Sequence, residues 1–214
     1  MPTPEIKICG LSTADTLAAA IAAQAHYAGL VFHPASPRHV SLTLAAQLGA
    51  QAAGQITRVG LFVDASDSDI GAAVAAAGLE ALQLHGSETP ARAAELRARF
   101  AIPVWKAIAV SARGDLDRAA LYAGAADLVL LDAKTPPGAL PGGMGLSFDW
   151  ALLDGWKAPL AWGLAGGLTP ANAAQAAAAT RAPLVDTSSG VESAPGIKDA
   201  ALIMQFCRAV RFAQ

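Results

Sequence analysis

The stretch LAWGLAGGLTPANAAQAAA, residues 160–178, contains one complete unit of the pattern that decides the fold. It begins with a short apolar run, Leu160–Leu164, whose length suits a buried strand. A Gly-Gly pair comes next, and Thr169-Pro170 then gives a helix start, because threonine caps a helix and proline fits its first turn. The alanine-rich run Pro170–Ala178 favours helix. The stretch therefore predicts a strand, a tight turn and a helix in that order.

The same unit recurs along the chain. Further strands are predicted at Ile6–Cys9, Gly29–Phe32, Arg58–Val63, Ala81–Leu84, Val104–Ile108, Leu128–Leu131 and Pro183–Val185. Further helices are predicted at Thr13–His26, Leu42–Ala53, Asp67–Ala77, Pro90–Arg99, Asp115–Tyr122, Phe148–Leu153 and Lys198–Phe212. Strands that alternate with helices imply a parallel sheet. The pattern therefore predicts an α/β protein with a parallel sheet.

The number of units distinguishes a closed barrel from an open sheet. Eight strand-and-helix units predict a (β/α)8 TIM barrel, an eight-stranded parallel barrel with outer helices. The alternative is a doubly wound open sheet, which has about five or six strands and often a Gly-x-Gly-x-x-Gly turn after its first strand. That turn is absent here. The Pro/Gly-rich stretch Ala133–Ser147 lies between two units and is interpreted as a long active-site loop, so a single barrel domain is expected over residues 1–214.

Composition excludes several classes of protein. Of the 214 residues 54% are hydrophobic and 15% charged, and the mean hydropathy is +0.40. Alanine accounts for 53 residues, however, and the longest uncharged runs, Thr16–Pro37 and Pro159–Thr180, are broken by Gly and Pro, so no transmembrane helix is predicted. A net charge of −2 without basic runs argues against nucleic acid as a partner. The two cysteines form no metal motif or disulfide framework, and a cytoplasmic protein is expected.

In such a barrel, catalytic groups lie where strands end. Strand alternation places Lys7 and Cys9 on the face opposite Ile6 and Ile8, which points them into the barrel if the isoleucines face the helices. The ammonium beside the thiol favours thiolate and a lower cysteine pKa, as a general base requires. The alternative is that Cys9 is a small buried hydrophobe. Asp132 ends a wholly apolar strand, where partial desolvation suits a general acid, although a loop cap is the other interpretation.

The last two strand ends resemble a phosphate site. The loop after Leu164 contains Gly166 and Gly167, and the loop after Val185 contains Ser188 and Ser189. Glycines allow close backbone approach, and the amides at a helix start favour an anion. The loops after strands seven and eight are the frequent phosphate site of this fold, and ordinary turn chemistry is the alternative. In the sixth loop, Gly143 and Gly145 can add backbone donors.

Two further strand ends are polar. Arg38 follows the second strand and can clamp a substrate carboxylate with its planar guanidinium, or lie on the surface. His85 ends the fourth strand, either as a ligand contact or as a polar core residue. The remaining histidines, His26, His33 and His39, form no metal-binding pattern and are expected on the surface or in loops, so no metal site is predicted.

The motifs that end these strands resemble those of the phosphoribosylanthranilate isomerases. The resemblance extends almost from end to end and rests on the order and spacing of KICGL (7–11), GLVF (29–32) with SPR (36–38), VGLFV (59–63), QLHG (83–86), LLD (130–132), GG (142–143), FDW (148–150), LAGGL (164–168), VD (185–186) with SSGVE (188–192), and PGIKD (195–199). Met144 and His33 depart from residues that are usual there.

The resemblance implies an Amadori rearrangement of N-(5-phosphoribosyl)anthranilate, an aldose–ketose isomerisation in tryptophan biosynthesis, with no metal or organic cofactor. It implies Cys9 as general base and Asp132 as general acid, Arg38 on the anthranilate carboxylate, and Asp186 on the substrate. Lys7 and His85 complete the candidate substrate-binding residues.

Two alternatives to this function stay open. One is the related isomerase of histidine biosynthesis, which has an aspartate in place of Cys9 and a twofold repeat that this chain lacks. The other is a barrel that binds a phosphosugar without turnover. The expected partner is a small phosphoribosyl substrate, with neither nucleic acid nor membrane, and the chain is a monomer or a homodimer.

Overall fold

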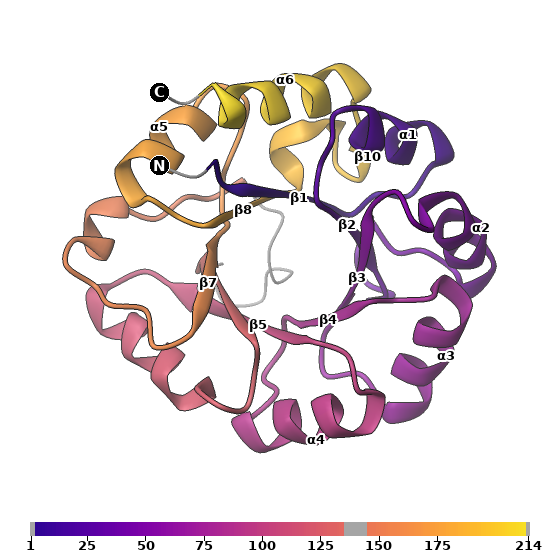
Figure 1. Cartoon of the computed structure of the whole chain (residues 1–214), viewed down its shortest axis with the longest axis horizontal. Helices are drawn as coiled ribbons and strands as arrows, with labels where there is room; N and C mark the ends of the chain where they lie inside the picture. Colours follow the sequence, from indigo (N-terminus) through magenta and orange to yellow (C-terminus); the bar gives the residue numbers. More distant parts are fainter. Residues whose placement is uncertain (1–2, 135–144, 213–214) are drawn as a thin grey trace.

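Eight parallel strands close into a barrel in chain order (Figure 1). The computed structural model describes residues 3–134 and 145–212. The strands are β1 (Glu5–Cys9), β2 (Tyr27–Val31), β3 (Thr57–Phe62), β4 (Ala81–Leu84), β5 (Val104–Val110), β6 (Leu128–Ala133), β7 (Ala161–Leu164) and β8 (Leu184–Thr187). β8 pairs with β1 and closes the ring. The predicted (β/α)8 barrel is confirmed.

Helices surround the barrel in Figure 1. They are α1 (Ala14–Ala22), α2 (Leu42–Ala52), α3 (Asp67–Ala77), α4 (Pro90–Phe100), the 3-10 helices η1 (Arg113–Tyr122) and η2 (Trp150–Leu153), α5 (Ala173–Thr180), the 3-10 turn η3 (Ser189–Val191) and α6 (Ala200–Arg211). Local signals account for several ends. Thr89 caps α4, whose first residue is Pro90, and α3 ends at Gly78 in the left-handed conformation with φ +58°.

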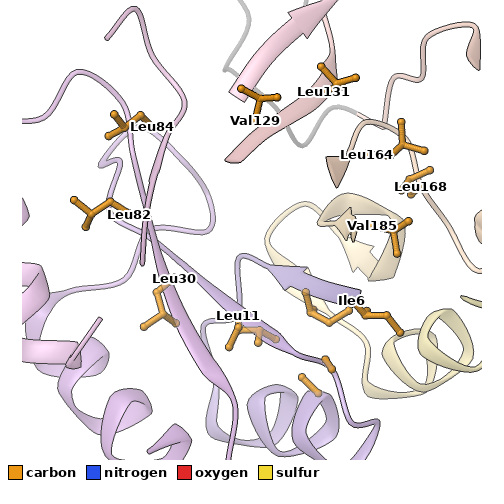
Figure 2. Close-up of a cluster of buried hydrophobic side chains, with 14 of the residues drawn as sticks. Ile6, Leu11, Leu30, Leu82, Leu84, Val129, Leu131, Leu164, Leu168 and Val185 are labelled. Atoms are coloured by element: carbon orange, nitrogen blue, oxygen red, sulfur yellow. The ribbon is translucent and has the colours of Figure 1, made fainter. Parts of the chain in front are cut away.

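Side-chain alternation divides each strand between two environments. Ile6 and Ile8 lie in the hydrophobic layer with helix residues such as Leu17 and Phe206. Figure 2 shows more of this layer, including Leu82 and Leu84 of β4, Val129 and Leu131 of β6, and Val185 of β8. A separate inner cluster is formed by Val59, Ala81, Trp105, Leu130 and Leu184. This apolar cluster fills the barrel near the strand starts, so the inward polar residues gather toward the strand ends.

Several predicted helix limits are wrong, each for a local reason. The helix predicted to reach His26 ends at Ala22, because Gln24 turns left-handed (φ +53°) and the Ala25 amide donates back to the Ala20 carbonyl at 2.9 Å. α5 begins at Ala173 rather than Pro170, because Asn172 spans the turn with bonds to the Thr169 amide and the Gly167 carbonyl. The segments 113–122 and 150–153 are 3-10 helices.

A short hairpin between β8 and α6 was not predicted. It consists of β9 (Glu192–Ala194) and β10 (Ile197–Lys198), which pair antiparallel. Lys198 therefore lies in a strand and not at the start of the last helix, which begins at Ala200. Among the described residues no helix combines the length and the apolar character needed to cross a bilayer.

Candidate active site

One open cavity, with an empty volume of about 790 Å³, lies at the carboxyl ends of the strands. Its walls come from the ends of β1, β2, β3, β4, β6, β7 and β8 and from the loops that follow them. Most of the predicted site residues line it: Cys9, Arg38, His85, Asp132, Gly145, Gly166, Gly167, Asp186, Ser188 and Ser189. Residues from distant parts of the sequence therefore share one cavity, as strand-end reasoning predicted.

Lys7 does not line the cavity. Its ammonium is fully buried and donates to both carboxylate oxygens of Asp186 at 3.0 Å, across the β1–β8 pairing. Burial alone would lower the pKa of Lys7, but the Asp186 carboxylate outweighs it and the pKa is raised. Lys7 is thus a charged group beneath the cavity wall, held by a residue that does line it.

The predicted direction of the Cys9 pKa is wrong for the protein alone. The thiol is 5% exposed and lines the cavity. Burial raises the pKa of Cys9 above its ordinary value of 9.0, and Lys7 and Lys198 oppose this only in part. The sequence identified the neighbouring ammonium correctly, but the desolvation of the thiolate is the larger effect.

Asp132 and His85 form a polar pair on the opposite wall, from β6 and the end of β4. The two are joined by Nε2 of His85 and Oδ2 of Asp132 at 3.2 Å, and the other carboxylate oxygen accepts from the Ala133 amide at 2.8 Å. The amide nitrogen of Gln83 lies 3.3 Å from Nδ1 of His85. The tautomer of His85 decides which of these two ring nitrogens donates, toward Gln83 or toward Asp132.

Three loops converge where a phosphate site was predicted. A Cβ at Gly167 (φ +62°) would stand 2.8 Å from the backbone of Leu146, and one at Gly166 (φ +84°) 2.6 Å from the Ala133 amide nitrogen. The loops after β6 and β7 therefore touch through their backbones, which only glycine allows. Thr187 Oγ1 donates to the Leu168 carbonyl at 2.7 Å and ties the β8 loop to them.

Arg38 is buried and bound by a carboxylate that the sequence did not identify. Its Nε and Nη2 donate to the two carboxylate oxygens of Glu192 at 2.7 and 2.8 Å. Lys198 also donates to Glu192. Burial alone raises the pKa of Glu192, but the hydrogen bonds from Arg38 and Lys198 prevail and lower it to about 2. Glu192 is thus ionised and holds two cations beside the cavity.

Sequence reasoning missed further residues of the cavity wall. Gln83 lies two positions before His85 on the same face of β4, so alternation could have identified it. His33 lies in the loop after β2, in keeping with the expected surface or loop position, and it also lines the cavity. Gly143 lies outside the described residues. Within residues 3–134 and 145–212, no group of three or more His, Cys, Asp or Glu side chains is placed to hold a metal ion.

Comparison with known sequences gives one consistent family. A sequence model described as N-(5'-phosphoribosyl)anthranilate (PRA) isomerase matches residues 6–209. The isomerase of that name from Rhodopseudomonas palustris (strain HaA2) is 52% identical over 207 residues, 96% of this chain and 95% of that protein. That from Paracoccus denitrificans (strain Pd 1222) is 53% identical over 202 residues, 94% of each chain.

Solved structures agree with the sequence comparison. The phosphoribosyl anthranilate isomerase of Thermotoga maritima superposes with a TM-score of 0.85 at 34% identity, over 97% of this chain and 98% of that one. A second crystal structure of such an isomerase, in complex with reduced 1-(o-carboxyphenylamino)-1-deoxyribulose 5-phosphate, has a TM-score of 0.85 at 31% identity and the same coverage.

Proposed function

Because this chain belongs to the N-(5'-phosphoribosyl)anthranilate isomerase family of tryptophan biosynthesis, we propose that Cys9 and Asp132 perform the proton transfers of that isomerisation. The reaction is the rearrangement of N-(5-phosphoribosyl)anthranilate to 1-(o-carboxyphenylamino)-1-deoxyribulose 5-phosphate. The observation that supports these roles is that the thiol at the end of β1 and the Asp132 carboxyl of β6 line the same cavity. A proton donor and a proton acceptor are what an aldose–ketose isomerisation requires.

Asp132 is the general acid of the first step. Its proton goes to the ribose ring oxygen, the bond between that oxygen and C1′ breaks, and the nitrogen lone pair forms the C1′=N iminium. Asp132 is left as a carboxylate. Nε2 of His85 lies 3.2 Å from Oδ2 and is proposed to carry a hydrogen that stabilises the negative charge developing there. His85 is therefore proposed to act through Asp132 as well as by contact with the substrate.

Cys9 is the general base of the second step. Its thiolate takes the proton from C2′, and the electron pair of that bond forms the C1′=C2′ double bond and neutralises the iminium. The resulting enolamine tautomerises to the ketone. Gly29 leaves room for this group, because the Cys9 sulfur and the Lys7 ammonium both lie about 3 Å from where a Cβ would stand.

The cavity walls are proposed to bind the two anionic ends of the substrate. Arg38 meets the anthranilate carboxylate, since its guanidinium is a planar donor held at the wall by Glu192. The loops at Gly166-Gly167 and Ser188-Ser189, with Gly145, bind the phosphate through backbone amides and hydroxyls. Asp186, held by Lys7, contacts the sugar.

The test is turnover of phosphoribosylanthranilate by the purified protein, followed by the loss of substrate fluorescence without added metal or cofactor. We expect Cys9→Ala and Asp132→Asn each to lower kcat by about 10²- to 10⁴-fold while product still binds. Consumption no faster than the uncatalysed rate would refute the isomerase activity. Near-normal kcat in either variant would remove the role of that residue alone.

A further inference from the structure

The β9–β10 hairpin contains two buried charged residues to which the proposed mechanism assigns no contact with the substrate. Glu192 begins β9, and Lys198 ends β10 directly opposite it in the antiparallel register. Both side chains are nearly buried, with 4% and 1% of their surface exposed. Charged side chains are seldom buried unless they are paired and hydrogen-bonded, and both of these residues are.

Glu192 accepts hydrogen bonds from four donors. Oε1 accepts from Nε of Arg38 at 2.7 Å and from the Lys198 ammonium. Oε2 accepts from Nη2 of Arg38 at 2.8 Å and from the amide of Gly196 at 3.1 Å. Two parallel bonds to one guanidinium fix its plane as well as its position. Glu192 therefore determines how Arg38 is presented at the cavity wall.

Lys198 connects the same carboxylate to the loop that follows β8. Its ammonium donates to the carbonyl of Ser188 at 3.1 Å and lies 3.2 Å from the hydroxyl of that residue. Ser188 follows β8 and lines the cavity in the proposed phosphate region. Glu192 and Lys198 thus form a continuous chain of charged bonds from Arg38 to Ser188.

The hairpin turn also packs against the loop that carries Arg38. Gly196 has φ +81°, and a Cβ there would stand 2.6 Å from the carbonyl oxygen of Pro37. The contact between turn and loop is thus made by backbone atoms, which move less than long side chains. It holds the Pro37–Arg38 segment from the outside while Glu192 holds the guanidinium.

We propose that Glu192 and Lys198 are positioning residues that set Arg38 and Ser188 at one fixed spacing, and so select substrates whose carboxylate and phosphate match that spacing. The proposal rests on the proposed function, in which Arg38 meets the carboxylate and Ser188 the phosphate. Charge supports it, because the Glu192 carboxylate lies between the two cations and offsets their mutual repulsion. Without Glu192, two neighbouring cations would repel each other and lose their common orientation.

Glu192→Gln tests the carboxylate end, since it keeps the size of the side chain and removes its charge. The readout is binding of the product and of the same compound without its carboxyl group, measured by calorimetry. We expect the product to bind about tenfold or more weakly, because charge-assisted bonds are among the stronger contacts. The analogue without the carboxyl group, which makes no use of Arg38, is expected to change about threefold or less.

Ser193→Ala is the matched control, because Ser193 lies in the same hairpin and is exposed, with one long bond to the Ile197 carbonyl. We expect it to bind both compounds as the unmodified protein does. Lys198→Met, at the other end, is expected to weaken both compounds alike, because both carry the phosphate that the Ser188 loop is proposed to bind.

Two results would overturn the proposal. One is an equal loss of affinity for both compounds in Glu192→Gln, which indicates general damage to the fold. The other is an unchanged preference for the carboxylated compound. Binding is measured without turnover, so failure of the unmodified protein to isomerise its substrate would refute the proposed function separately. If Glu192→Gln keeps activity, its weaker binding of the carboxylated compound must also appear as a raised KM for the carboxylated substrate. A lower kcat alone would not support the proposal.

Discussion

Gly29 on β2 offers a direct test of whether the arrangement around Cys9 matters. A Cβ at this position would stand 2.9 Å from the Cα of Cys9, 3.0 Å from its sulfur and 3.1 Å from the Lys7 ammonium. Ordinary contacts begin at 3.4 Å, and a backbone atom cannot rotate away as a side chain can. Gly29→Ala must therefore push β1 and β2 apart by about half an ångström at the site of the proposed base.

The expected cost of Gly29→Ala follows from that displacement. Overpacking of a core typically costs about 1–3 kcal/mol of unfolding free energy. A misplacement of about 1 Å can lower a catalysed rate by about 10²-fold, so half that distance suggests about tenfold. We expect a protein that folds, with its urea midpoint lowered, and with kcat about tenfold or more below that of the unmodified protein.

Gly114→Ala is the control for Gly29→Ala. A Cβ at Gly114 meets nothing within 4 Å, and the residue is exposed in η1. This variant is expected to keep normal kcat and normal or slightly higher stability. If Gly29→Ala had the kcat of the control, close packing of β2 against Cys9 would be irrelevant to turnover, and the reasoning would be wrong.

Three further predictions concern the buried charges. Lys7→Met leaves Asp186 buried without its cation, so we expect the free energy of unfolding, measured in urea, to fall by about 3–5 kcal/mol. Adding Asp186→Asn should restore part of that free energy. A fall of less than about 1 kcal/mol in Lys7→Met would contradict the importance of the ion pair. Because burial raises the pKa of Cys9 above 9.0, its alkylation by iodoacetamide in a Cys207→Ala background should still accelerate as pH passes 9, and a plateau below that pH would contradict the direction. The pKa of Glu192 is lowered from 4.5 to about 2 in the folded protein, so its contribution to stability is present above pH 4.5 and is lost as pH falls toward 2. Glu192→Gln should therefore show a shallower fall in Tm over that interval than the unmodified protein, and equal slopes would count against it.

The fold was predictable because its signals are local and repeated. The bounds of β4 and α3 agree with the prediction to the residue, since Ser66 and Gly78 mark both ends of α3 and a short apolar run defines β4. Predictions failed where nothing in the sequence marks a change of backbone. The chain turns just after α1 at Gln24, which takes the left-handed conformation (φ +53°) without being a glycine. The β9–β10 hairpin contains few apolar residues, so no periodicity marked it.

The site was predictable only in part, for a related reason. Strand alternation and the place where each strand ends are local properties, and they brought Cys9 and Asp132 to one cavity. The partner of a charged residue is not a local property. Arg38 and Glu192 are 154 positions apart, so nothing near Arg38 indicates its carboxylate. The predicted direction of the Cys9 pKa was wrong for a similar reason, because the sequence shows the neighbouring Lys7 but not the burial of the thiol.

The raised pKa of Cys9 constrains the order of events in the proposed mechanism. Because burial raises the pKa of the Cys9 thiol, the thiolate that serves as base needs a further favourable charge beside it. Ring opening places the iminium cation beside Cys9 and leaves the matching negative charge on Asp132, at the opposite wall of the same cavity. We propose that this carboxylate takes up the thiol proton when the thiolate forms. A unit charge about 4 Å from the thiolate is worth about 4 kcal/mol at an effective dielectric constant of about 20. Proton donation by Asp132 therefore comes first, and the substrate itself completes the activation of Cys9 at the carbon that the thiolate then deprotonates.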